Sequence, residues 1–167
     1  MKKTVLLLAA FSLFSCLLCG CGASGQDKTY DLDQVAAAIS AAAPVPYPAD
    51  MDDEYLTGMY GIDPADVEEY RGQYSNTNTF TDELLLVRAA EGKADAVREA
   101  CEARRAAKQE QAAMYDEVQA QKAQNGRVVV RGDYVIFVVA GDDGRIADGE
   151  VNEVYQEIDK AIEDALA

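Results

Sequence analysis

Apolar residues recur every three or four positions in two stretches, residues 31–42 and residues 149–166. This spacing predicts two amphipathic helices, one near each end of the expected domain. Asp31 or Asp33 supplies an N-cap for the first helix, and Pro44 ends it. The apolar positions are Leu32, Val35, Ala36 and Ile39 in the first helix, and Val151, Val154, Tyr155, Ile158, Ile162 and Leu166 in the second.

Continuous apolar runs bounded by turn residues predict strands in the middle and toward the end of the chain. RVVVRGDYVIFVVA at residues 127–140 predicts a hairpin, because glycine at the first central position suits a type II′ turn. DELLLVRA at residues 82–89 predicts a buried strand. The segment before it, residues 66–75, predicts either the partner of this strand or a short helix, and we take it as the partner.

An intermittent apolar stripe between these strands predicts one long helix over residues 93–123, ended by Asn125-Gly126. A short helix is expected over residues 53–59. The chain therefore predicts a single α+β domain over residues 30–167. It has a small, mostly antiparallel sheet of about four strands, a long central helix, and N- and C-terminal amphipathic helices packed against the sheet.

The first residues have the features of a lipoprotein signal. Two lysines precede an uncharged run over residues 5–18, which is shorter than the roughly 20 apolar residues that a membrane-spanning helix needs. The run leads into LCGC at residues 18–21, which resembles the lipobox of bacterial lipoproteins: an aliphatic residue, then a small residue before the acceptor cysteine. We predict a signal peptide over residues 1–20 and lipidation at Cys21.

Diacylation of Cys21 gives stable anchoring, because two acyl chains hold a protein at a membrane where one is marginal. Residues 21–29 would then be a flexible tether, and the expected location is the cell membrane, lipid-anchored, on the extracellular side. Cys16 is an alternative lipidation site, although its use would shorten the apolar run. A metal site at Cys16, Cys19 and Cys21 is disfavoured, because these residues lie in a stretch that is cleaved or acylated.

The charge of the chain excludes nucleic acid as a partner. Removal of residues 1–20 takes two of the 15 basic residues and leaves 13 against 30 acidic residues, a formal charge of −17. Such a chain repels nucleic acid and anionic lipid surfaces. The remaining candidate partners are the membrane lipid attached through Cys21, and a protein, a basic peptide or a cell-wall component.

The chain contains no histidine, which excludes Ser-His-Asp triads and histidine-ligated zinc hydrolases. Cys101 falls on an apolar helix stripe and is expected to be a small buried hydrophobe. We expect no cofactor and assign no catalytic residue.

A half-matched calcium loop lies at GDDGRIADGE, residues 141–150. Asp143 and Glu150 fall at two ligand positions of an EF-hand loop, whereas the first and third positions carry Val139 and Gly141. These two acidic residues are weak metal candidates only, and the simpler interpretation is a polar connection in which Asp148 caps the last helix.

Three other groups of residues suggest chemistry without defining a site. Paired carboxylates such as Asp82-Glu83 would serve a glycosidase only if they faced one cleft at a defined separation. The tyrosines at positions 55, 60, 70 and 74 are near enough in sequence to share a surface and could line a glycan or peptide groove. The simpler interpretation is that several of them are core or half-buried residues. The basic stretch from Arg98 to Lys108 could receive an anionic ligand or an acidic partner. The simpler interpretation is an intramolecular salt-bridged face, with part of its charge paired along the helix.

Several short motifs together resemble the lipoproteins that contain domain of unknown function 4358. Besides the lipobox they are Tyr60-Gly61-Ile62-Asp63, the Asp82-Glu83 pair that opens an apolar strand, Arg104-Arg105 leading to Tyr115, and Gly132-Asp133-Tyr134-Val135. The resemblance covers most of residues 30–145. It implies an anchored α+β protein and no particular activity.

Taken together, these patterns predict a non-enzymatic binding or interaction module that is anchored at the cell envelope. The alternative is an envelope hydrolase that uses carboxylates, with or without a weakly bound divalent cation.

Overall fold

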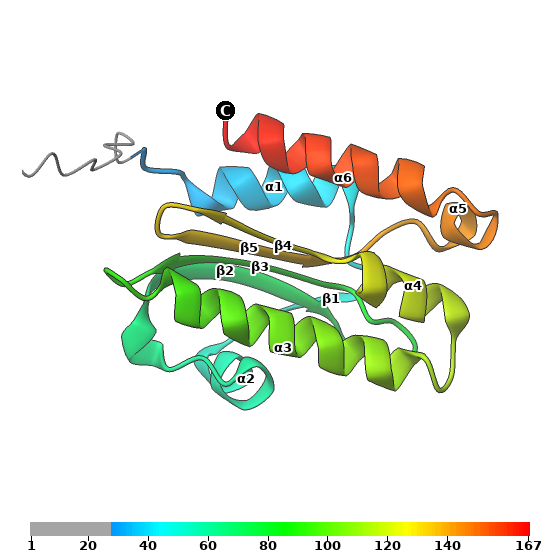
Figure 1. Ribbon diagram of the computed structural model, residues 1–167, viewed down its shortest axis with the longest axis horizontal. Helices are drawn as coiled ribbons and strands as arrows, with labels where there is room; N and C mark the ends of the chain where they lie inside the picture. Colours follow the sequence, from blue (N-terminus) through cyan, green and yellow to red (C-terminus); the bar gives the residue numbers. More distant parts are fainter. Residues whose placement is uncertain (1–27) are drawn as a thin grey trace, which may run out of the picture.

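The computed structural model describes residues 28–167, which form a five-stranded antiparallel sheet between two layers of helices (Figure 1). The strand order is β1-β2-β3-β5-β4. The strands are β1 (Pro48–Asp50), β2 (Val67–Ser75), β3 (Glu83–Ala89), β4 (Arg127–Arg131) and β5 (Tyr134–Val139). The α+β class expected from the sequence is confirmed, with one strand more than the four expected.

The two central strands are buried along almost their whole length. β3 pairs with β2 on one side and with β5 on the other, in the register Tyr70↔Val87 and Val87↔Val135. Every residue of β5 is buried, as its uninterrupted apolar run predicts. β4 and β5 form the expected hairpin, in which Gly132 takes a φ of +58° at the first central position.

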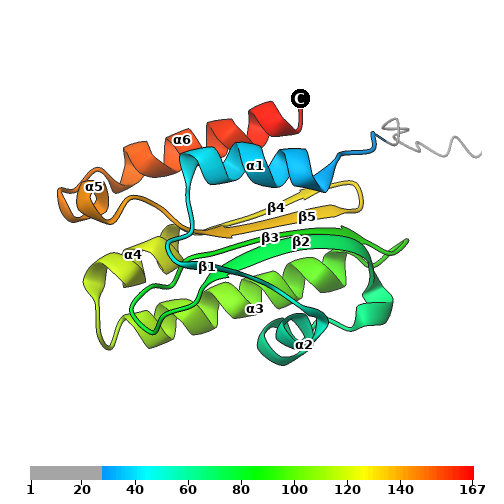
Figure 2. The same ribbon diagram turned by 180° about the vertical axis from the view of Figure 1, so that it is seen from behind.

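One face of the sheet is covered by the two ends of the described chain. Helices α1 (Leu32–Ala42) and α6 (Val151–Ala165) pack side by side on this face (Figure 2). Their apolar stripes meet the side chains of alternate strand residues, which makes the first core. Its strand members are Leu84, Leu86, Tyr134, Ile136 and Val138.

The other face carries the remaining helices, α3 (Ala94–Ala112), α4 (Glu117–Asn125), and α2 (Asp53–Tyr55), which continues into the π-helical turn η1 (Leu56–Tyr60). Gly61 closes this turn with a φ of +70°. A 3₁₀ turn, η2 (Pro64–Asp66), leads into β2. The second core lies here and includes Leu85, Val87, Val135 and Phe137.

The long central helix expected over residues 93–123 is wrong, since it is divided into α3 and α4. The break falls at residues 113–116, where the side chain of Asp116 accepts a hydrogen bond from the backbone N–H of Gln119 and starts α4 as an N-cap. Gly126 follows α4 and ends it as expected. Its φ is −52°, so it does not adopt the left-handed conformation that is common for glycine after a helix. A Cβ at Gly126 would lie 2.7 Å from Cγ2 of Val139, so the close approach of α4 to β5 requires glycine.

The C-terminal region also differs from expectation. The polar connection contains a short helix, α5 (Asp143–Ala147), which is capped by Asp142. Asp148 ends α5 and does not cap α6, so the role predicted for it is wrong. The backbone N–H of Asp148 donates a hydrogen bond to the carbonyl of Gly144. Asp148 therefore belongs to the turn between α5 and α6.

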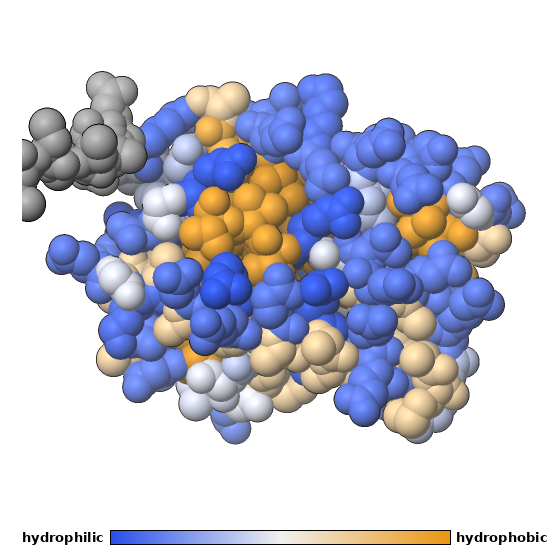
Figure 3. Space-filling view, in the orientation of Figure 1, coloured by the Kyte–Doolittle hydropathy of each residue, from blue (hydrophilic) through white to orange (hydrophobic). Residues whose placement is uncertain are grey.

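The two edges of the sheet differ in character. β4 forms one edge, and its residues Val128, Val129 and Val130 are partly exposed. The surface carries an apolar patch in the part of the view where the β4–β5 hairpin lies in Figure 1 (Figure 3). The opposite edge is formed by the short β1 and by the part of β2 that β1 does not reach. Within residues 28–167, no helix has the length and apolar character needed to cross a membrane.

Candidate functional site

A buried carboxylate, Glu83, is the centre of the most concentrated group of polar side chains in the described part of the chain. Its side chain is 1% exposed. Two tyrosines donate to it, Tyr55 over 2.6 Å to Oε1 and Tyr60 over 2.8 Å to Oε2. Arg104 donates through Nε over 3.1 Å and through Nη2 over 2.5 Å, and the ammonium of Lys108 lies 2.8 Å from Oε1.

This environment shifts the pKa of each member of the cluster. Burial alone would raise the pKa of Glu83, but the hydrogen bond and charge of Arg104 and the charge of Lys108 hold it below its ordinary value of 4.5. Burial lowers the pKa of Lys108, and the nearby charge of Glu83 opposes this change only in part. Burial and the charge of Glu83 raise the pKa of Tyr55 and of Tyr60. Glu83 is therefore ionised, and both tyrosines are protonated, at neutral pH.

Helix periodicity explains why two cations face inward here. The buried stripe of α3 runs through Val97, Cys101, Lys108 and Ala112. Arg104 falls between Cys101 and Lys108 on the same stripe, so it also points toward the sheet and is only 11% exposed. The intramolecular ion pairs expected of this basic stretch are present. Arg98 pairs with Asp95 and Arg105 with Glu102 along the helix. Arg104 and Lys108 pair instead with Glu83 on the sheet.

The cluster forms the floor of a cavity of about 360 Å³. Tyr55 and Tyr74 lie on its wall with their rings stacked and their centroids 4.2 Å apart. The segment from Ser75 to Thr81 supplies hydroxyl and amide groups, and Met59 and Tyr115 add apolar surface near the opening. A carboxylate, two cations and a tyrosine pair thus converge on one space large enough for a small polar molecule.

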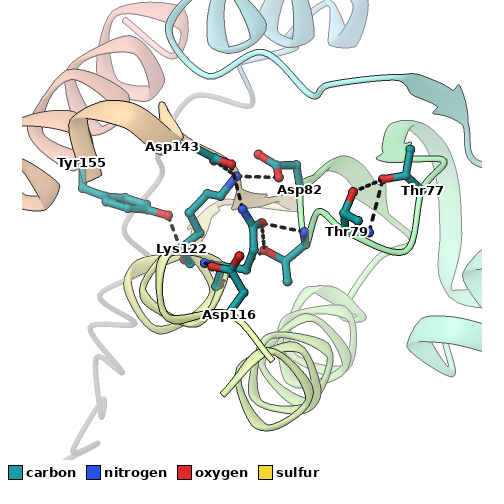
Figure 4. A network of polar contacts seen from close by, with 9 residues as sticks. Thr77, Thr79, Asp82, Asp116, Lys122, Asp143 and Tyr155 are labelled. Carbon is teal, nitrogen blue, oxygen red and sulfur yellow. Dashed lines mark hydrogen bonds and ion pairs between the residues drawn. The ribbon is translucent and has the colours of Figure 1, made fainter. Parts of the chain in front are cut away.

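A second buried network holds the loop that borders this cavity (Figure 4). Lys122 of α4 is fully buried, and its ammonium pairs with Asp82 over 2.7 Å and with Asp143 of α5. Gln119 donates to Asp143 over 2.9 Å and accepts from the backbone N–H of Thr81 over 2.9 Å. The network therefore joins α4, α5 and the loop before β3.

The carboxyl group of Asp82 is completely buried, which is unusual for an acidic side chain. Burial raises its pKa, although the charge and hydrogen bond of Lys122 oppose the change. Its Oδ1 atom has no hydrogen-bond partner among residues 28–167. The neighbours Asp82 and Glu83 thus belong to two separate clusters, each held by its own cations.

The structure places the other residues suggested by the sequence as follows. The weak metal candidates do not converge, because Asp143 pairs with Lys122 while Glu150 accepts from Arg145 over 2.9 Å. In the described range, no group of three histidine, cysteine, aspartate or glutamate side chains is arranged to hold a metal ion. Cys101 is buried as expected, and burial raises the pKa of its thiol to about 12. Cys16 and Cys21 lie outside the described residues.

Of the four clustered tyrosines, three come together and one does not. Tyr55, Tyr60 and Tyr74 surround the cavity and its floor. Tyr70 instead donates over 2.8 Å to Asp53 and does not line the cavity. The inward orientation of Arg104 and Lys108 is not among the features predicted from the sequence, although their spacing of four residues along the apolar stripe of α3 indicates it.

Comparison with known proteins identifies one family. A family model described as domain of unknown function 4358 matches residues 44–140, a range that contains every residue lining the cavity. No curated protein and no solved structure matches the chain. Because the model covers more than half of the 167 residues, the chain belongs to the domain of unknown function 4358 family.

Proposed function

We propose that this protein is a lipid-anchored binding module on the extracellular side of the cell membrane, which takes a small polar ligand with an anionic group into the cavity above Glu83. The observation that carries the proposal is the excess of positive charge on the cavity floor. Arg104 and Lys108 share the single carboxylate of Glu83. The other acidic residue of the cavity lining, Asp116, caps α4 and forms no ion pair with either cation among residues 28–167. The charge excess is therefore local to the floor, where one cation is left for a ligand.

Besides its charge, the Lys108 ammonium has hydrogen-bond donors that are free to bind a ligand. Glu83 already accepts from two tyrosines and from Arg104. Lys108 has three N–H donors, and Oε1 of Glu83 is the one charged partner within 4 Å among residues 28–167. A ligand carboxylate would add a charge-assisted hydrogen bond in a partly dry site, where such bonds are strongest. The stacked pair Tyr55 and Tyr74 offers an adjoining flat surface for a sugar ring or a peptide group.

Binding accounts for these features better than carboxylate hydrolysis. A general acid needs a carboxyl whose pKa is raised toward neutrality and which faces the reacting bond. Glu83 faces the cavity but its pKa is lowered, whereas Asp82 has a raised pKa but does not line the cavity. The two properties do not occur in one residue.

The ligand proposal is tested with a soluble cell-wall fragment that carries a free carboxylate, and with its amidated form as the uncharged counterpart. We expect the carboxylate form to bind and Lys108→Met to weaken its binding roughly ten- to hundredfold, because a hydrogen bond between charged groups contributes about 1.5–3 kcal/mol. Isothermal titration measures the dissociation constants, and Lys160→Met on the exposed side of α6 removes the same charge far from the cavity. Equal binding of both forms of the fragment, or equal weakening by both variants, would contradict the proposal.

The anchor is tested separately at the predicted acceptor cysteine. Cys21→Ala should remove the diacylglycerol mass from the mature protein and move it from the detergent phase to the aqueous phase in a phase-partition experiment, because the acyl chains supply the membrane affinity. Cys16→Ala is the matched control and should leave both readouts unchanged. Diacylated, membrane-bound Cys21→Ala protein would show that the assignment of the acceptor is wrong.

A further inference from the structure

The free part of the β2 edge borders a groove of about 900 Å³ that is separate from the cavity. β1 pairs only with residues 73–75 of β2, and the last contact is the hydrogen bond from the N–H of Met51 to the carbonyl of Gly72. Beyond it, the rest of β2 runs on between α1 and the segment that contains α2 (Figure 2). No residue lines both the groove and the cavity.

The groove is strongly acidic. Its lining contains one basic side chain, Arg71, and five acidic ones: Asp33, Asp50, Asp53, Glu68 and Glu69. This charge is opposite in sign to the excess on the cavity floor. Arg71 and Arg88 offset part of this charge by pairing with Asp33, Glu68 and Glu69. Asp50 and Asp53 have no ion-pair partner among residues 28–167, so the remaining acidic excess favours a positively charged ligand.

Arg71 shows how the groove holds a cation. Its guanidinium reaches across from β2 to α1, where Nε lies 2.5 Å and Nη2 lies 3.3 Å from the two oxygens of Asp33. Apolar residues line the same space, Met51, Leu56 and Ile62 from the α2 segment and Leu84 and Leu86 from β3. This combination suits lysine or arginine side chains, which bury their methylene stems while the charged ends reach carboxylates.

The backbone of β2 offers hydrogen-bonding groups to the same space. In an antiparallel strand the N–H and C=O of alternate residues point to the same side. The carbonyl of Gly72 points toward β1, so the N–H and carbonyl of Tyr70 also point outward, beyond the end of β1. In the described chain the Tyr70 carbonyl accepts only from the side chain of Arg71, over 2.7 Å.

The geometry points to a second binding site, in which this groove takes a basic peptide segment in an extended conformation. The peptide main chain lies along the free edge of β2, in line with β1, and pairs with the outward backbone groups of Tyr70. Its lysine or arginine side chains reach the carboxylates of Asp50 and Glu68 at the rim. This site is independent of the ligand proposed for the cavity.

The probe is an acetylated, amidated pentapeptide of alternating lysine and threonine, and a pentapeptide of alternating glutamate and threonine is its counterpart. Binding to the full chain in neutral detergent is measured by isothermal titration. We expect only the lysine peptide to bind, more weakly as salt is added, and the double variant Asp50→Asn with Glu68→Gln to weaken it at least fivefold. Both side chains are exposed, that of Glu68 by 50%, so we expect this variant to keep the fold, which a thermal melt checks.

The matched control removes the same charge from exposed positions of α6, as Glu153→Gln with Glu163→Gln, and should change binding less than twofold. Lys108→Met should also leave peptide binding unchanged, so failure of the cavity proposal would not be confused with failure of this one. Absence of binding, or equal weakening by the α6 control, would overturn the site. Hydrogen exchange supplies a second readout: the Tyr70 amide should become protected when the peptide binds, and an unprotected amide in the saturated complex would overturn strand pairing.

Discussion

Replacing Glu83 with glutamine should lower the free energy of unfolding by about 3–5 kcal/mol, because it leaves two cations close together in a largely buried site without their common anion. Arg104 and Lys108 are 11% and 9% exposed, and each loses its charged partner. Glutamine has nearly the same size as glutamate, so no cavity forms. The decrease in the free energy of unfolding therefore reflects lost charge and hydrogen bonding. Denaturant unfolding of wild type and variant measures the difference.

Glu68→Gln is the matched control, since Glu68 forms an ion pair with Arg88 at the surface, where such pairs contribute about 0–1 kcal/mol. The pH dependence gives a further check. The pKa of Glu83 is lowered in the folded protein, so its stabilising effect is present above the unfolded value near 4.5 and is lost as the pH falls below it. The gap between wild type and Glu83→Gln should therefore narrow in acid. A loss no larger than that of Glu68→Gln would show that the cluster does not stabilise the fold.

Lys122→Met should have a similarly large effect, again about 3–5 kcal/mol, because it leaves the carboxylate of Asp82 buried without a cation. Lys122 and Asp82 are both about 1% exposed or less, so water cannot replace the lost interaction. The methionine retains the volume of the aliphatic stem, which limits the packing change. Chemical denaturation again gives the change in unfolding free energy.

Adding Asp82→Asn to Lys122→Met should restore much of the lost stability, because the double variant no longer buries a charge. Burial already raises the pKa of Asp82, and without Lys122 this effect is unopposed, so lowering the pH should also reduce the penalty of the single variant. If the double variant is as unstable as the sum of the two single variants, the two residues are not coupled and the interpretation is wrong.

Most of the fold is predictable from this sequence, because the apolar positions along each helix and strand are also the positions that are buried in the structure. The runs at β3 and β5 are continuous and short, and the stripes of α1 and α6 are regular. Two of the differences from the expected fold have clear physical reasons. Residues 112–116 include good helix formers, and one capping side chain, Asp116, decides the break between α3 and α4. β1 is three residues long and begins with Pro48, so it has almost no pattern of its own.

The candidate site was less predictable because it depends on contacts between distant segments. Glu83 and Arg104 are 21 residues apart, and Tyr55 and Arg104 are 49 apart. An analysis of α3 that considers only its apolar residues overlooks Arg104 and Lys108, which lie on the same buried stripe. Their positions on this stripe are visible in the sequence, but the carboxylate that they share is found only once the sheet places β3 beneath them.

The pairing of α1 with α6 also bears on how the chain folds after synthesis. The phenolic oxygen of Tyr30 lies 3.2 Å from the carbonyl of Leu166, so the first and last elements of the domain meet. Neither helix falls within residues 44–140 of the family match. One face of the sheet therefore lacks part of its cover until the fifteen-residue helix α6 has emerged, because α1 supplies only some of the side chains of that layer. We therefore expect this domain to complete its folding late, once α6 is available. A chain cut short before α6 should expose apolar side chains of the first core, among them Leu84, Leu86, Ile136 and Val138, and aggregate.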